Sequence, residues 1–101
     1  DTQAVEDSAT VRKRVIEAYQ WQLQRQSCLN MALSPKQLEQ FAPLNEQAAL
    51  IFEKAQQRLN LSARGYHRIL RVARTIADLA QSEQIQTGHL TEALSYRGQH
   101  H

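Results

Sequence analysis

A run of apolar residues between positions 66 and 80 recurs at helical spacing, and no other pattern limits the possible folds as strongly. Such spacing gathers apolar side chains on one face of an α-helix and leaves the opposite face polar. Ser62 precedes the run, and serine is a preferred helix N-cap. We therefore expect a helix over residues 63–81. Its buried face is expected to consist of Tyr66, Ile69, Leu70, Ala73, Ile76, Ala77 and Ala80.

The rest of the sequence also favours helices. β-branched residues are sparse, and no segment alternates apolar and polar residues long enough to form a strand. Further helices are expected at residues 10–26, 35–41, 46–59 and from position 87 onwards. The predicted fold class is therefore all-α, a small bundle of about five helices.

Helix-capping residues support these boundaries. Ser34 followed by Pro35 is a helix-start signal, and Pro43 ends the helix that begins there. Asn60 stands where a helix that ends in a left-handed residue needs Gly or Asn. The other expected N-caps are Ser8 or Thr10, Asn45 and Thr87.

The apolar faces of the other helices are looser. The residues expected to face inward are Val11, Val15, Ala18, Tyr19 and Leu23 in the first helix, Ala48, Ile51, Phe52, Ala55 and Leu59 in the third, and Leu90, Ala93 and Leu94 in the fifth. Trp21 falls off the stripe of its helix. We expect it to pack on another element, with contact to an absent domain as the alternative.

The length of 101 residues fits one domain. We expect a helical domain over residues 10–97, a linker from an upstream domain over residues 1–9, and a frayed tail over residues 98–101, whose His pair is compatible with a purification tag. The chain begins with Asp1 rather than Met, so it looks excised from a longer protein. No apolar run approaches the ~20 residues that cross a bilayer, so no membrane partner is expected and the cytoplasm is the default compartment.

Composition excludes several classes of site. No two of the three glycines share a short loop, which excludes a phosphate-binding loop and a dinucleotide fingerprint. The single cysteine, Cys28, excludes an internal disulfide and a multi-cysteine zinc site. Because Cys28 lacks an activating motif, we expect an inert, partly buried thiol. His67 and His89 have no second ligand at helical spacing, so no metal site is expected.

The net charge of +2 conceals two basic segments, residues 11–25 and residues 61–78, which carry +3 each. Basic segments favour anionic partners. In the first segment, Arg12, Lys13 and Arg14 are candidates for contact with DNA phosphates. The favoured interpretation of these three residues is nevertheless a solvated helix face, with contact to DNA as the alternative.

The second basic segment places Arg64 in the first turn of the expected helix. Backbone N–H groups and the helix dipole attract an anion there, and a guanidinium is a planar, permanently charged group suited to phosphate. Arg68 and Arg71 follow on the face opposite the apolar stripe. Most arginine stripes are only solvated faces, but a cation at a helix start is disfavoured unless an anion compensates it. Arg74 and Asp78, four residues apart, are expected to pair on the flank.

Residues 61–79, with the sequence LSARGYHRILRVARTIADL, resemble the C-terminal lid of magnesium-chelatase-like AAA+ ATPases, and most closely the competence-protein branch of that family. Residues 11–15 (VRKRV), residues 30–33 (NMAL) and residues 85–97 fit the same lid. The resemblance covers about residues 8–97. Asn60 and Gly65 depart from the family's usual Gly and Ala, and neither departure affects Arg64.

The resemblance implies that Arg64 is the sensor-2 arginine, which contacts the terminal phosphate of ATP bound with Mg²⁺ in a separate upstream α/β core, in its own or a neighbouring subunit. Arg68 and Arg71 match family positions with less fixed roles and are expected to support this basic face. The resemblance also implies a homo-oligomer, with a hexamer expected. The fragment has no Walker motif of its own, so we expect it to bind no nucleotide and hydrolyse no ATP in isolation.

For the competence branch, the implied work is that of a motor acting on DNA during recombination. For a true magnesium chelatase it would instead be metal insertion into a porphyrin. A free-standing helical module that binds DNA or a partner protein through its basic faces stays open as a third interpretation. The lack of a helix-turn-helix spacing with a short glycine turn weakens it.

Overall fold

The computed structural model describes residues 8–97. The helices within that range are α1 (Ser8–Gln26), the 3-10 turn η1 (Asn30–Ala32), α2 (Pro35–Phe41), α3 (Glu46–Arg58), α4 (Ala63–Leu79) and α5 (Thr87–Arg97). The described part of the chain contains no β-strand, although Leu44 and Ile85 form an isolated parallel bridge between two loops. The predicted all-α class is confirmed. Of the linker expected over residues 1–9, residues 1–7 lie outside the described residues, as does the tail at residues 98–101. Residues 8 and 9 already belong to α1, so the predicted end of the linker is wrong by two residues.

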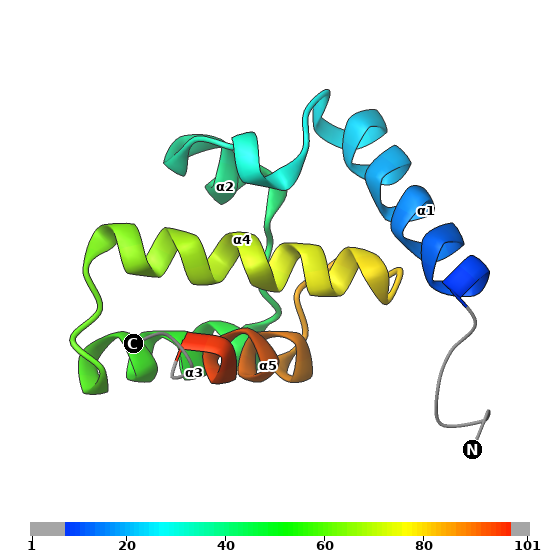
Figure 1. Ribbon diagram of the computed structural model, residues 1–101. Helices are drawn as coiled ribbons and strands as arrows, with labels where there is room; N and C mark the ends of the chain where they lie inside the picture. The colour runs from blue at the N-terminus through cyan, green and yellow to red at the C-terminus, as the bar shows by residue number, and fades with distance from the viewer. Residues whose placement is uncertain (1–7, 98–101) are drawn as a thin grey trace, which may run out of the picture.

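Helix α4 is the centre of the domain. It contacts α1, η1, α2 and α5. Figure 1 shows α2 on one side of α4, α3 and α5 on the other, and α1 beyond its C-terminal end. Ile69, Leu70, Ala73 and Ala77 of α4 are buried, as the periodicity predicts. Ala80 is exposed because the helix ends one residue before it.

The apolar core lies between α2, α3, α4 and α5. Its buried residues are Leu33, Leu38, Ala42, Ala48, Phe52, Ile69, Leu70, Ala73, Ala77, Ile85, Leu90 and Ala93. Phe52 of α3 stacks on Tyr66 of α4, with ring centroids 4.3 Å apart and planes inclined by 6°. Burying large apolar side chains in this way stabilises a domain by about 1.5–3 kcal/mol each. The core therefore fixes the position of α4, and no α1 residue belongs to it.

Side-chain caps set the starts of three helices. Ser34, Asn45 and Ser62 each accept a hydrogen bond from the backbone N–H three residues later, as predicted. Asn60 adopts the predicted left-handed conformation, with φ of 52°. The prediction that Leu59 faces inward is wrong: α3 has ended at Arg58, and the Leu59 side chain is 37% exposed.

The start of α5 differs from its prediction. Thr87 is already helical, and its buried Oγ1 has no hydrogen-bond partner among the residues that the structure describes, so Thr87 is not the cap. Instead, the backbone N–H of Gln86 donates to Nδ1 of His89 at 3.0 Å. A side chain that reaches back to the residue before the helix satisfies an otherwise unpaired donor.

Helix α1 departs furthest from expectation. It is helical from Ser8, the first described residue, so Thr10 lies inside the helix and is not a cap. Ala18 is buried as predicted, but Tyr19 and Leu23 are 48% and 50% exposed. Val11 is also exposed, at 39%. The predicted inward face of α1 is therefore largely wrong.

The face of α1 that does turn inward is polar. Gln22 and Gln26 join Ala18 as the buried residues of this helix, at a spacing of four residues. A method based on apolar periodicity misses such a face, because the burial of an amide depends on its hydrogen-bond partners rather than on its hydropathy.

Candidate phosphate-binding face

A tight turn and a serine cap build the start of α4. After the left-handed Asn60, Ser62 accepts a hydrogen bond from the backbone N–H of Gly65 at 3.0 Å. The backbone N–H groups of Ala63 and Arg64 have no acceptor within residues 8–97. Unpaired N–H groups at a helix start, together with the helix dipole, create a region of positive potential.

Arg64 lies in this first turn, and its side chain is exposed. It makes no hydrogen bond and no ion pair with any residue in the described range. Arg68, one turn later, is likewise exposed and has no partner among residues 8–97. Both guanidinium groups are therefore available to an anion outside the domain, and no internal carboxylate offsets the cost of Arg64 at a helix N-terminus.

Arg71 is engaged within the domain. Its Nε and Nη2 donate to the backbone carbonyl of Leu33, at 3.2 and 2.8 Å. Leu33 is a buried residue between η1 and α2, so this contact ties that segment to α4. Arg71 thus shares the side of α4 that carries Arg64 and Arg68, as the sequence predicts, but its guanidinium is already bound within the domain.

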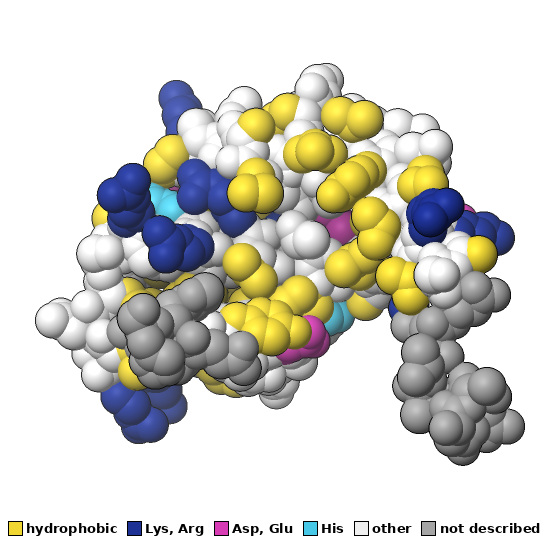
Figure 2. All heavy atoms as spheres, in the orientation of Figure 1, with side chains coloured by type: hydrophobic (Ala, Val, Ile, Leu, Met, Phe, Trp, Pro, Cys, Tyr) yellow, Lys and Arg dark blue, Asp and Glu magenta, His cyan; other side chains and the backbone are white. Residues whose placement is uncertain are grey.

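A groove runs along the same side of α4. Its volume is about 450 Å³, and it is lined by Met31, Arg64, Arg68, Arg71, Val72, Thr75 and Ile76. Figure 2 shows basic side chains gathered over the N-terminal half of α4, beside apolar ones. Met31, from η1, is 86% exposed at the edge of this groove. The groove thus combines exposed cations with an apolar lining.

Arg74 and Asp78 form the predicted pair, with Nη2 and Oδ1 3.1 Å apart. The prediction that the pair lies on the flank is wrong, because both side chains are fully buried. Arg74 donates to the backbone carbonyls of Phe41, Ser82 and Glu83, at 3.4, 2.6 and 2.9 Å. These contacts hold the loop before α5 and the end of α2 against α4.

Burial lowers the pKa of Arg74, and the neighbouring carboxylate of Asp78 opposes that shift. Arginine in proteins nevertheless stays charged. The buried cation is therefore compensated by Asp78 and by carbonyl oxygens, while its Nε has no acceptor among the described residues. A buried charge is tolerated only with such compensation.

Asp78 is also the point where α1 attaches to α4. Arg25 of α1 donates to both oxygens of Asp78, at 2.8 and 3.1 Å. Asn30 donates to Asp78 at 2.9 Å and to Thr75 at 3.1 Å. The side-chain Oε1 of Gln22 in turn accepts from the backbone N–H of Asn30 at 2.9 Å. Sequence reasoning missed this cluster, because its members are dispersed along the chain and carry no local signal.

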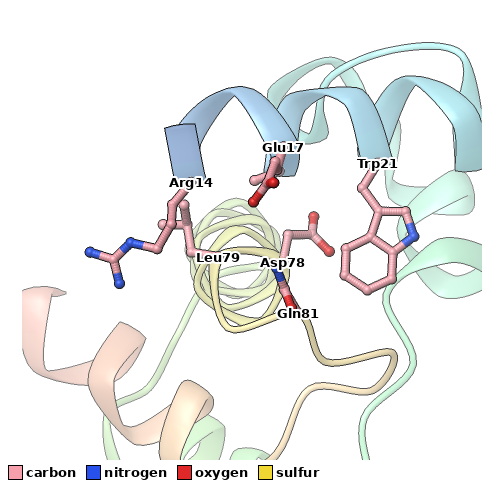
Figure 3. Close-up of a pocket in the computed structure, with 7 residues that line it drawn as sticks. Arg14, Glu17, Trp21, Asp78, Leu79 and Gln81 are labelled. Atoms are coloured by element: carbon pink, nitrogen blue, oxygen red, sulfur yellow. The ribbon is translucent and has the colours of Figure 1, made fainter. Parts of the chain in front are cut away.

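The remaining candidate residues lie on α1, beyond the C-terminal end of α4, whereas Arg64 lies in the first turn of α4 (Figure 1). Arg12, Lys13 and Arg14 are exposed, and Trp21 is half-buried. Figure 3 shows Trp21 pointing from α1 toward the C-terminal end of α4, where a pocket of about 260 Å³ also has Arg14 and Asp78 in its lining. Trp21 thus borders a hollow between α1 and the end of α4 (Figure 3), and its contact with an absent domain stays a prediction.

The described residues contain no cluster of three or more His, Cys, Asp or Glu side chains that would hold a metal ion. Cys28 is half-buried against the core. His67 is half-buried and meets the ring of Tyr66 edge-on, with centroids 5.4 Å apart. Across residues 8–97, no helix combines the length and apolarity that a membrane span requires.

The family described as "Magnesium chelatase, subunit ChlI C-terminal" matches residues 5–97, nearly the whole chain. The chain belongs to this family. Its membership accords with the all-helical fold and with the run of residues at the start of α4 on which the resemblance rested.

Curated relatives of this magnesium chelatase C-terminal family member include the "Competence protein ComM" of Haemophilus influenzae, which is 47% identical over 92 residues. Two proteins described as "Uncharacterized protein YifB", from Salmonella typhimurium and Escherichia coli, are 45% and 46% identical over 92 residues. In each comparison the match covers 91% of this chain and 18% of the relative. The chain thus spans less than a fifth of the length of these relatives.

Proposed function

We propose that this chain is the C-terminal helical lid of a ring-forming AAA+ ATPase, and that Arg64 is its sensor-2 arginine. The observation that carries the proposal is the state of Arg64: it is exposed and has no partner within residues 8–97, in the first turn of a helix with unpaired N–H groups. Membership of the magnesium chelatase C-terminal family supports the assignment.

The proposed role of Arg64 follows from the chemistry of phosphoryl transfer. Charge builds on the γ-phosphate oxygens in the transition state, and a guanidinium held near them stabilises it. Such stabilisation is effective only if the group is held in place before the reaction. Burial of Ile69, Leu70, Ala73 and Ala77 in the core gives α4 that rigidity.

Arg64 would also couple hydrolysis to motion. The γ-phosphate anchors the arginine, so the loss of that phosphate releases the lid from the nucleotide. Because α4 contacts η1 and three other helices, the whole domain would move with it.

The neighbouring arginines have different proposed roles. Arg68 is the second cation for the phosphates, since it is exposed on the same side of α4. Arg71 acts as a positioning residue, because its guanidinium is bound to the carbonyl of Leu33 and faces a phosphate only if it gives up that contact.

In this proposal the full-length protein binds ATP with Mg²⁺ in an upstream α/β core and assembles as a homo-oligomer, expected to be a hexamer in the cytoplasm. Its work is that of a motor on DNA in competence or recombination. The similarity to a protein named for competence supports work on DNA over metal insertion into a porphyrin, although the family description names a magnesium chelatase.

The proposal is tested by ATP turnover in the full-length protein that carries this domain. Arg64→Ala is expected to lower turnover strongly while nucleotide binding is partly retained. Unchanged turnover would refute the role of Arg64.

Exposure of Arg12 and Lys13 on α1 favours one alternative, a helical module that binds DNA by itself. Titrating the isolated domain against duplex DNA at two salt concentrations separates the two functions. Tight, salt-sensitive binding that Arg12→Ala and Lys13→Ala weaken would support the module. The lid proposal predicts weak binding by the domain alone.

A further inference from the structure

Helix α1 carries an outward face that nothing in the described domain covers. Ile16, Tyr19 and Leu23 are 47%, 48% and 50% exposed, and they follow one another at i, i+3 and i+7. Arg12 continues the same face one turn earlier and is exposed. We call Arg12, Ile16, Tyr19 and Leu23 the outer face of α1.

This face is organised differently from the other exposed apolar residues. Leu50 of α3, for example, is 57% exposed but has no large exposed apolar neighbour at helical spacing on its own helix. Isolated exposed leucines are ordinary, whereas apolar residues at i, i+3 and i+7 are the pattern with which a helix packs into an apolar groove.

The inner face of α1 is held against the domain by polar contacts, so the helix has no reason to turn its outer face toward the core. Gln22 and Gln26 are buried there, and Arg25 is held by Asp78. The polar contacts fix the rotation of α1 about its axis, so Ile16, Tyr19 and Leu23 are directed away from the domain. Turning them inward would break the ion pair of Arg25 with Asp78.

We propose that the outer face of α1 is the docking surface for the domain that precedes this one in the same polypeptide. The inference rests on that part of the proposed function which places the chain at the C-terminal end of a longer ATPase. The family description names a C-terminal region, and the match covers only 18% of the relatives. The preceding polypeptide therefore enters at α1, the first helix.

The outer face has only three apolar side chains, which is a small contact area. A domain linked covalently to this one can bind such a small area. A covalent linker gives two domains an effective concentration in the millimolar range, so a modest surface suffices for stable contact. Arg12 lies at the N-terminal end of the outer face. We therefore expect the preceding domain to offer an apolar groove with an acidic side chain beside Arg12.

The test measures the accessibility of single thiols in the full-length protein. Tyr19→Cys places a thiol on the outer face, and Leu50→Cys is the matched control on α3. Alkylation is followed at the individual peptide by mass spectrometry, first in the native protein and then in urea. The proposal predicts that Cys at position 19 reacts at least ~10-fold more slowly than Cys at position 50 in the native protein, and that the rates converge in urea.

Equal native rates at positions 19 and 50 would overturn the proposal, provided that Leu23→Cys gives the same result. Protection that disappears on dilution would also overturn it, because a second copy rather than the preceding domain would then be the occupant. Neither result would touch the role of Arg64, which is measured by ATP turnover. Conversely, normal ATP turnover in Arg64→Ala would refute the role of Arg64, whereas slow alkylation at position 19 would still be expected.

Discussion

Arg25 and Asp78 lie 53 positions apart in the sequence and form a two-pronged ion pair, with Nη1–Oδ1 and Nη2–Oδ2 distances of 2.8 and 3.1 Å. Asp78 also pairs with Arg74, so one buried carboxylate serves two arginines from two helices. No α1 residue belongs to the apolar core, and this buried polar cluster ties α1 to α4.

Replacing Asp78 by Asn is therefore expected to be severe. It leaves Arg74 buried without its counter-charge, and breaking a buried pair in this way destabilises a protein by about 3–5 kcal/mol. Urea unfolding, followed by circular dichroism, measures the loss. A change below about 1 kcal/mol would contradict the account of Asp78 as the shared acceptor.

Arg25→Gln is the milder form of the same test. Arg74 and Asn30 remain on Asp78, so the expected loss is about 1.5–3 kcal/mol, typical of hydrogen bonds to charged groups. Hydrogen exchange is expected to rise first in α1, while the core helices stay protected. Arg12→Gln, an exposed change on the same helix, is the control and is expected to have little effect.

The sequence predicted what depends on local patterns. The apolar period of α4 identified Ile69, Leu70, Ala73 and Ala77 as core residues, and Ser62 was recognised as the cap of that helix. Both depend on residues within one or two turns of each other. Short-range steric and hydrogen-bond preferences act at that distance.

The sequence did not predict the packing of α1, because partners distant in sequence decide it. The Gln22 side chain is buried because its Oε1 accepts a hydrogen bond from the backbone N–H of Asn30, eight residues later. Arg71 looks like the other arginines of its face, and only the folded chain places the carbonyl of Leu33 beside it. Arg64 was placed correctly in the first turn of α4, whereas its partner remains a proposal.

Arg71 and Arg68 are expected to respond differently to substitution. Arg71→Met removes two hydrogen bonds from a charged donor to the carbonyl of Leu33 and is expected to cost about 1.5–3 kcal/mol of stability. Arg68→Met, on the exposed part of the same face, is expected to stay within about 0.5 kcal/mol of the wild type. Chemical denaturation of both variants measures the contrast. Equal losses would show that Arg71 has no special structural role.

Gly65→Ala is expected to stabilise the domain. Gly65 lies in the first turn of α4, and an added Cβ would lie 3.4 Å from Oγ of Ser62, an ordinary contact. Alanine reduces the entropy lost on folding, a gain of about 0.5–1 kcal/mol. The thermal midpoint is expected to rise. A fall would indicate that the new methyl group disturbs the hydrogen bond of Ser62 to the N–H of residue 65.

Alkaline pH is expected to destabilise the domain through Tyr66. Burial, with a smaller contribution from Glu39, raises the pKa of Tyr66 above its ordinary value of about 10. The folded state therefore binds the phenolic proton more tightly than the unfolded state does. This part of the stability is fully present below about pH 10, the unfolded pKa, and is lost as the pH rises through the folded pKa.

Urea midpoints at pH 8 and pH 10.5 test the sign of this effect. The wild type is expected to lose more stability between the two conditions than Tyr66→Phe, which keeps the ring stacked on Phe52 without an ionisable group. Identical losses in the two proteins would show that Tyr66 does not contribute.

ATP turnover by the full-length protein with Arg64→Ala tests the claim that Arg64 is the sensor-2 arginine. Arg58→Ala, at another exposed arginine in the last turn of α3, is the control. Loss of a group that stabilises transition-state charge typically lowers turnover by about 10²–10³-fold. We expect a loss of that order for Arg64→Ala, with nucleotide affinity changed by less than about 10-fold, and normal turnover for Arg58→Ala. Wild-type turnover in Arg64→Ala would contradict the claim.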